Sequence, residues 1–245
     1  MRWGTICFDL DNTLFSHEEA FEKAIFFCFD SILKENKLTN NIKLNELFTA
    51  FKKYSDLYWD DYEKGVITPK EYRRRRFLTT TQQFQLPFNQ NDADHFHEHY
   101  YSVVDDFSVP YPHLYSLISK LVETSIKIGI ITNGNVDTQY NKIKKLGLNN
   151  WISDDYLFIS GELGVAKPNR EIFDMAKEKL QSNGDYLFIG DSWEHDVVGS
   201  MNAGWDSIFL NTRNEDPSSS HQPIEICSTL QDVANIIYKE NNLRG

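Results

Sequence analysis

The chain has 245 residues, of which 40% are hydrophobic and 14% aromatic, and its formal net charge is −11. This length and hydrophobic content favour a folded core, with room for a smaller companion domain, over a disordered chain. The negative charge argues against a nucleic-acid polymer as partner, because phosphate backbones bind positively charged proteins. No apolar stretch reaches the roughly 18 residues that a membrane-spanning helix needs, and we recognise no secretory leader.

The three cysteines, Cys7, Cys28 and Cys227, are odd in number and far apart in the sequence. This pattern is typical of reduced packing residues and of neither a disulfide framework nor a zinc site. We therefore expect a cytoplasmic protein that has no membrane partner.

A buried strand is predicted near the start of the chain, where Ile6-Cys7-Phe8 runs directly into Asp9-Leu10-Asp11-Asn12-Thr13. Residues i and i+2 of an extended segment point the same way. Asp9 and Asp11 can therefore reach one small volume at the end of this strand. The alternative is an acidic turn, since Asp and Asn are common turn residues.

Residues 16–107 have a different character, with apolar and aromatic residues at helical spacing and no alternating segment between them. We predict four or five helices here. One begins at Thr68-Pro69, with proline in its first turn, and another opens within residues 89–94. Because this block follows the first strand, it is predicted to be a helical cap domain inserted into a core domain formed by residues 1–15 and 108–245.

From Pro110 onward, apolar runs alternate with helical patterns. The predicted strands are 126–131, 156–159, 186–189 and 207–210, and the predicted helices are 112–121, 136–146, 171–180, 197–203 and 230–238. A Ser-rich surface loop is expected at 214–222. Repeated strand–helix units imply right-handed crossovers and a parallel sheet covered on both faces. The predicted fold class is therefore α/β, a Rossmann-like doubly wound parallel sheet with an inserted all-helical cap.

Three later polar segments also follow predicted strands or precede helices. Thr132-Asn133 offers a hydroxyl and an amide beside a helix N-terminus, which favours an anionic oxygen, although a simple helix cap is the alternative. Lys167 precedes Pro168 in the loop before a helix, whereas most lysines are solvated surface charges. The third segment contains Gly190-Asp191 and, five residues later, Asp196. A helix N-cap is an alternative that suits Asp196 better than Asp191.

Taken together, these segments lie at or near the carboxyl ends of parallel strands, which share one edge of the sheet. Like charges 4 Å apart repel by ~4 kcal/mol at an effective dielectric of 20, so several ionised acids there need a cation. Lys167 supplies one positive charge, and Mg²⁺, which binds carboxylates together with substrate phosphate, would supply the rest. This set of groups is typical of phosphoryl transfer.

The four segments resemble, in order, the four motifs of the haloacid dehalogenase superfamily, and the inserted helices resemble its cap between the first two motifs. The resemblance implies that Asp9 is a nucleophile forming an aspartyl phosphate and that Asp11 is the acid and base. It further implies that Thr132 and Lys167 hold the phosphoryl oxygens, with Asn133 nearby as a substrate-binding residue.

The resemblance also implies a Mg²⁺ site made by the side chains of Asp9 and Asp191 and the main-chain carbonyl of Asp11, with Asp196 in support. The dehalogenases of the superfamily have no acid at the position of Asp11, because a halide leaves without a proton. We therefore predict a phosphatase or phosphomutase that lacks dehalogenase activity.

The leaving group depends on the cap. Residues 57–68, together with Arg76-Phe77 and residues 161–169, resemble bacterial pyrimidine 5′-nucleotidases of this superfamily. The resemblance implies a pyrimidine nucleoside 5′-monophosphate as substrate, with Tyr58, Trp59 or Phe77 stacking on the base and Arg76 facing the cleft. The alternative for these aromatic residues is a place in the cap core.

The alternative activities are a sugar-phosphate phosphatase, for example on an acyl-sugar phosphate, and a phosphomutase. A non-catalytic scaffold is disfavoured because the motif positions are all retained. We expect a monomer or homodimer acting on a small phosphorylated metabolite. A metal site at His95, His97 and His99 is disfavoured, because only the first and last share a helix face. For the same reason the side chains of residues 73–76, four arginines in a row, cannot all face one site.

Overall fold

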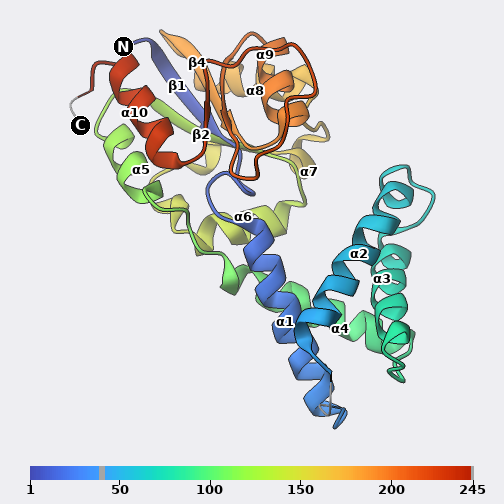
Figure 1. Cartoon of the computed structure of the whole chain (residues 1–245). Helices are drawn as coiled ribbons and strands as arrows, with labels where there is room; N and C mark the ends of the chain where they lie inside the picture. Colours follow the sequence, from blue (N-terminus) through green and yellow to red (C-terminus); the bar gives the residue numbers. More distant parts are fainter. Residues whose placement is uncertain (39–41, 244–245) are drawn as a thin grey trace. The chain divides into compact units, whose positions relative to one another are not determined.

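The computed structural model describes residues 1–38 and 42–243 (Figure 1). The chain divides into two compact units, Met1–His17 with Ser108–Gly245, and Glu18–Phe107. We call the first the core unit and the second the cap unit. Within the described part of the chain, no helix is long and apolar enough to cross a membrane.

The core unit is built on a six-stranded sheet in the order β3-β2-β1-β4-β5-β6. All neighbouring strands in it are parallel. The strands are β1 (Trp3–Phe8), β2 (Lys127–Thr132), β3 (Leu157–Ile159), β4 (Asp185–Gly190), β5 (Asp206–Leu210) and β6 (Glu225–Cys227). Central β1 places Phe8 opposite Ile130 of β2 and Ile189 of β4. The ends of these three strands therefore lie side by side.

Helices cover both faces of the sheet, which confirms the predicted doubly wound α/β fold class. They are α5 (Leu114–Val122), α6 (Val136–Lys145), α7 (Ser160–Leu163), α8 (Arg170–Leu180), α9 (Gly199–Asn202) and α10 (Leu230–Glu240). Helices α5 and α10 pack together on one face, and α8 and α9 pack together on the other (Figure 1). Short helical turns η2 (Leu148–Asn150), η3 (Asp154–Tyr156) and the π-helix η4 (Trp193–Val198) join these elements.

The core unit differs from the sequence prediction in the start of one helix and in one additional strand, besides the short elements α7, η2 and η3. The helix expected over 197–203 begins earlier, as η4 at Trp193, because the Ser192 hydroxyl accepts a hydrogen bond from the amide of His195 and caps it. Strand β6 was not predicted, because it has only three residues and two of them are exposed, too few for an apolar pattern. The three cysteines are free and buried, as expected.

The cap unit contains α1 (His17–Glu35, which begins at the unit boundary), α2 (Leu44–Glu63), α3 (Pro69–Gln83), α4 (Gln90–Val103) and the short turn η1 (Val104–Phe107). The predicted helix starts are confirmed, since Thr68 and Asn89 each cap a helix through a reciprocal capping box. Between the helices lies an aromatic core in which the rings of Phe29 and Phe77 are each 4.7 Å from that of Phe96.

Candidate active site

A buried lysine joins two of the predicted acids. Lys167, in the loop between α7 and α8, is 4% exposed. Its Nζ donates to Oδ1 of Asp9 at 2.7 Å and to Oδ1 of Asp196 at 2.6 Å. Asp9 follows β1 and Asp196 lies within η4, so the sheet brings together groups that are 158 and 29 residues from the lysine in sequence.

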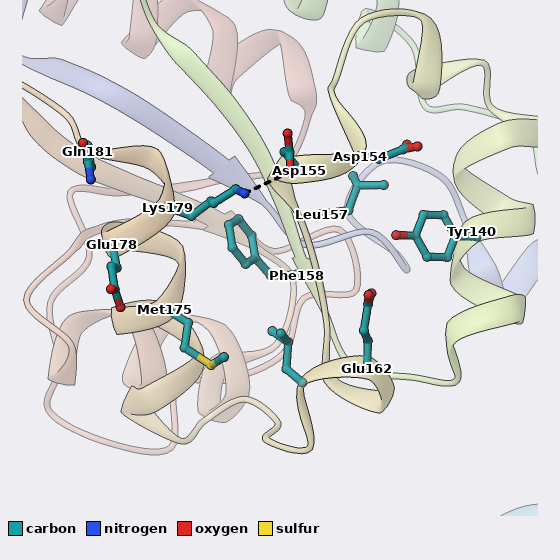
Figure 2. A pocket seen from close by; sticks show the side chains of 11 residues that line it. Tyr140, Asp154, Asp155, Leu157, Phe158, Glu162, Met175, Glu178, Lys179 and Gln181 are labelled. Carbon is teal, nitrogen blue, oxygen red and sulfur yellow. Dashed lines mark ion pairs between the residues drawn. The ribbon is translucent and has the colours of Figure 1, made fainter.

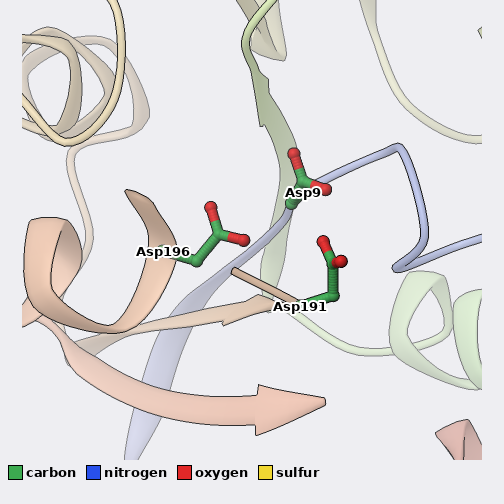
Figure 3. A group of neighbouring side chains, drawn as sticks. All are labelled: Asp9, Asp191 and Asp196. Atoms are coloured by element: carbon green, nitrogen blue, oxygen red, sulfur yellow. The ribbon is translucent and has the colours of Figure 1, made fainter. Parts of the chain in front are cut away.

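Three buried carboxylates form one group at this sheet edge. Asp9, Asp191 and Asp196 each offer an oxygen within 4.8 Å of the others (Figure 3). The Thr13 hydroxyl lies 3.2 Å from Oδ2 of Asp9 and 3.4 Å from Oδ1 of Asp191, so it links two of them. Asp191 follows β4, directly beside β1 in the sheet.

The charges in this group do not balance. Burial raises the pKa of Asp9 to about 7: the loss of solvent, together with the nearby charges of Asp196 and Asp11, outweighs the lowering effect of Lys167. Burial, together with the charges of Asp9 and Asp196, raises the pKa of Asp191 to about 8. Buried acids that hold protons near neutral pH are destabilised when ionised and gain from a bound cation. An all-oxygen donor set of this kind fits a hard divalent ion such as Mg²⁺.

Asp196 reaches the group because residue 190 is a glycine. A Cβ atom built on Gly190 would lie 2.3 Å from Oδ2 of Asp196, so any larger residue there would push the acid away. The same oxygen accepts a hydrogen bond from the Ser192 amide at 2.9 Å. Asp196 is therefore not the helix N-cap that the sequence allowed as an alternative; Ser192 has that place.

The second motif, Thr132-Asn133, lies beside the loop that carries Lys167. Thr132, the last residue of β2, is 1% exposed. The Asn133 amide donates to the carbonyl of Lys167 at 2.9 Å and accepts from its N–H at 2.8 Å. Asn133 thus holds the main chain of the lysine loop, and its direct contact with a substrate stays a prediction.

Asp11 has a different environment from Asp9. Its carboxylate accepts two bonds from Lys142 Nζ, at 2.7 and 2.9 Å, and one from Gln139 Nε2, at 2.9 Å. His17 Nδ1 lies 3.5 Å away. Burial alone would raise the pKa of Asp11, but the Lys142 charge, with His17 and Gln139, outweighs burial and leaves it below its usual value.

Three residues at this edge of the sheet were not predicted from the sequence. Gln139 and Lys142 lie on α6, where they are buried although the helix pattern places only apolar residues toward the core. Two polar residues three apart, just after Thr132-Asn133, were the available signal. Arg213 Nη2 lies 2.8 Å from Oδ2 of Asp191. It follows β5 in a segment without a recognisable motif, so this contact could not be predicted from the sequence.

The family comparison agrees with this geometry. A model of haloacid dehalogenase-like hydrolases matches residues 3–204. The chain belongs to this family of hydrolases. It is 30% identical to pyrimidine 5′-nucleotidase YjjG of Escherichia coli (strain K12) over 246 residues, covering 98% of this chain and 100% of that protein.

Two further relatives span nearly the whole of this hydrolase. A glyceraldehyde 3-phosphate phosphatase of Methanocaldococcus jannaschii is 23% identical and covers 95% of this chain and 96% of its own. The magnesium-bound crystal structure of the HAD-hydrolase YfnB from Bacillus subtilis superposes with a TM-score of 0.78 at 24% identity, covering 97% of this chain and 99% of that one. At this identity the superposition supports the fold alone.

In the cap unit of the hydrolase, Arg74 and Arg76 of the four-arginine run contact different groups, so the four side chains do not all face one site, as predicted. Arg74 forms a two-pronged ion pair with Asp94, at 2.7 and 2.5 Å. Arg76 is buried and contacts neutral groups, the Tyr72 hydroxyl at 3.5 Å and Nδ1 of His97 at 3.4 Å. Its guanidinium also lies 4.8 Å from the ring centroids of Phe51 and Tyr72. Substrate contact by Arg76 stays a prediction.

The aromatic residues proposed for base stacking separate in the structure. Phe77 is fully buried in the cap core, whereas Trp59 is 44% exposed and packs edge-on against Tyr62 and Tyr72. The Tyr58 hydroxyl pairs with Thr79 at 3.1 Å. Of the three, Trp59 has the largest free surface. Among the described residues, the histidines of α4 are not part of a metal-type cluster.

A surface pocket of the core unit lies apart from this site. It has a volume of about 510 Å³ beside edge strand β3, and none of the proposed catalytic, substrate-binding or metal-binding residues lines it (Figure 2). Four acids line it (Asp154, Asp155, Glu162 and Glu178), and Lys179 pairs with Asp155 at 2.9 Å. The chemistry of the hydrolase is therefore assigned to the strand ends and not to this pocket.

Proposed function

We propose that this hydrolase is a Mg²⁺-dependent phosphomonoesterase that acts on a small phosphorylated metabolite through an aspartyl-phosphate intermediate. The observation that carries the proposal is the convergence of Asp9, Asp191, Asp196 and Lys167 at one sheet edge. Such a group of acids with one lysine suits the charge of a phosphoryl group only when a divalent cation is also present.

In this mechanism a carboxylate oxygen of Asp9 attacks phosphorus, and the bond from phosphorus to the ester oxygen breaks. Asp11 gives a proton to the leaving alkoxide and then takes one from the water that hydrolyses the aspartyl phosphate. Lys167 and Thr132 would hold the phosphoryl oxygens. The side chains of Asp9 and Asp191 and the Asp11 carbonyl would hold Mg²⁺, which would neutralise phosphoryl charge, with Asp196 in support.

The proposed substrate is a pyrimidine nucleoside 5′-monophosphate. Support comes from the 30% identity to a pyrimidine 5′-nucleotidase over nearly all of both chains, and from an exposed Trp59 able to stack on a base. A sugar-phosphate or triose-phosphate phosphatase is the second candidate, favoured by the similarity to a glyceraldehyde 3-phosphate phosphatase.

Phosphate release from a panel of esters, with Mg²⁺ and with chelator, tests the proposal. We expect the pyrimidine monophosphates to exceed purine monophosphates, hexose phosphates and glyceraldehyde 3-phosphate in kcat/KM, and chelator to abolish release. Asp9→Asn should lower kcat by at least about 10³-fold, whereas Asp174→Asn, at an acid of α8 whose side chain is 45% exposed and pairs with Arg170, serves as control. Undiminished cleavage in chelator would overturn the metal, and preferred hexose phosphate turnover would overturn the nucleotidase.

A further inference from the structure

Two side chains of α6, Lys142 and Gln139, surround the carboxylate of Asp11. We propose that they are positioning residues that fix this acid–base group in line with the phosphoryl-binding Thr132. The inference rests on the proposed function, and it extends the site from the four sequence motifs to a helix that carries none of them.

Lys142 holds Asp11 from one side. Its Nζ is within 2.9 Å of both carboxylate oxygens, and the residue is only 5% exposed. The contact joins residues 131 apart in sequence. A buried ammonium paired with both oxygens of one carboxylate restricts the rotation of that carboxylate. The direction in which Asp11 presents its remaining lone pairs is therefore set by α6.

Gln139 ties the same carboxylate to the second motif. Its Nε2 donates both to Oδ2 of Asp11 at 2.9 Å and to Oγ1 of Thr132 at 2.7 Å, while its Oε1 accepts from Lys142 at 2.9 Å. All the polar atoms of this 1% exposed amide are used. Because Thr132 accepts this bond, its own hydroxyl proton remains available to donate to a phosphoryl oxygen.

The turn before α6 is shaped to admit the amide. Gly134 has φ +151, and a Cβ atom built there would lie 2.9 Å from Cδ of Gln139. A larger residue would displace the amide that bridges Thr132 and Asp11. A glycine at this position therefore makes room for the bridge.

Lys142 and Gln139 could instead have a purely structural role, in which they anchor α6 to the loop after β1. Loss of such a role would lower the turnover of all substrates alike. A positioning role affects only the step that needs a proton from Asp11. Loss of an alkoxide needs that proton, whereas p-nitrophenolate leaves without one. The ratio of kcat/KM for an alkyl ester to kcat/KM for p-nitrophenyl phosphate therefore separates the two roles, since kcat/KM reports the step in which phosphoryl is transferred to Asp9.

The experiment compares Lys142→Met with Lys144→Met, the same change at an exposed lysine of the same helix. We expect Lys142→Met to lower kcat/KM for the alkyl ester about 10–100-fold, which is less than the whole rate factor that acid–base catalysis can supply. The kcat/KM for p-nitrophenyl phosphate should change by no more than about threefold. Lys142→Arg should restore most of the loss. Lys144→Met should match the unmodified protein.

A second variant keeps the test valid if Lys142→Met does not fold. Gln139→Met preserves side-chain length and the ion pair, and we expect it to lower the same ratio by several-fold. In an Asp11→Asn background, Lys142→Met should add no further loss, because the lysine acts through the acid.

Equal losses for both esters, or a further loss in the Asp11→Asn background, would overturn the inference and leave the proposed function intact. An unmodified protein that cleaves neither ester would overturn both.

Discussion

The core unit and the cap unit each bury a basic side chain, Lys167 and Arg76, and surround it differently. Lys167 lies between the carboxylates of Asp9 and Asp196. The Arg76 guanidinium lies against two aromatic rings and Nδ1 of His97. The imidazole of His97 donates from Nε2 to the Arg73 carbonyl at 2.9 Å and so accepts at Nδ1, as a neutral ring does.

The difference shows what each unit does with a buried charge. In the core, the positive charge of Lys167 is needed because several buried carboxylates lie close together at the proposed active site. Removing this charge leaves the repulsion between them uncompensated. In the cap, the guanidinium is accommodated by neutral groups, and its Nε has no hydrogen-bond partner among the described residues. The four predictions that follow test this contrast, from the largest expected effect to the smallest.

Lys167→Met should destabilise the core most. Removing one partner of a buried ion pair leaves uncompensated charge, and the expected loss in the free energy of unfolding is about 3–5 kcal/mol. Urea unfolding at pH 8 in chelator measures it. Lys179→Met, at a lysine paired on the surface with Asp155, is the control and should cost less than about 1 kcal/mol. Equal losses for the two variants would contradict the contrast.

Stabilisation of the core by Mg²⁺ should grow with pH. The pKa values of Asp9 and Asp191, raised by burial to about 7 and about 8, exceed their unfolded values. The stability associated with these protons is therefore present below about pH 4 and is lost as pH rises through 7–8. Mg²⁺ replaces the protons, so the increase in Tm on adding it should be small at pH 6 and larger at pH 8.5.

Thermal unfolding with and without Mg²⁺ at these two pH values measures the effect. Asp191→Asn should remove most of the Mg²⁺-dependent increase in Tm at both pH values, because it removes a proposed Mg²⁺ ligand. A shift that is the same at pH 6 and pH 8.5 in the unmodified protein would mean that protons and Mg²⁺ do not compete at this site.

The cap should lose stability as the solution becomes acidic. Burial, together with the Arg76 charge, lowers the pKa of His97 well below its usual value of 6.5. As the pH falls, this imidazole takes up a proton in the unfolded chain at a higher pH than in the folded protein. The free energy of unfolding therefore decreases as the pH drops below 6.5, by at most about 1.4 kcal/mol per pH unit. Hydrogen exchange of α4 between pH 7.5 and 5.5, corrected for the intrinsic rate, measures this loss. His97→Gln should flatten the dependence, and His95→Gln, at an exposed site on the same helix, should retain it.

Arg76→Met should change stability least, within about 1 kcal/mol, because lost contacts with two rings are offset by the recovered cost of burying a charge. If the predicted substrate contact holds, the KM for the nucleotide rises while kcat is retained. Urea unfolding and steady-state kinetics measure the two quantities. A stability loss as large as that of Lys167→Met would show that the guanidinium supports the cap as strongly as the lysine supports the core.

Much of the core could be predicted from the sequence because its signals are local. Apolar runs end directly at Asp9, Thr132 and Asp191, and a parallel sheet brings such strand ends to one edge. The cap helices were predicted for the same reason, from apolar spacing and from caps such as Thr68-Pro69. Strand β6 and the start of η4 were missed, because three residues or one irregular turn leave no periodic pattern.

The sequence by itself determined the order of elements, the parallel sheet and which residues carry the four motifs, because each depends on neighbours a few positions apart. The tertiary structure alone decided which groups meet. It placed Lys142 and Gln139 on Asp11, across 131 and 128 residues, and Arg213 on Asp191, and it enclosed Phe77 in the cap core. Such contacts depend on how helices pack on the sheet and on each other, and no pattern of adjacent residues specifies that geometry.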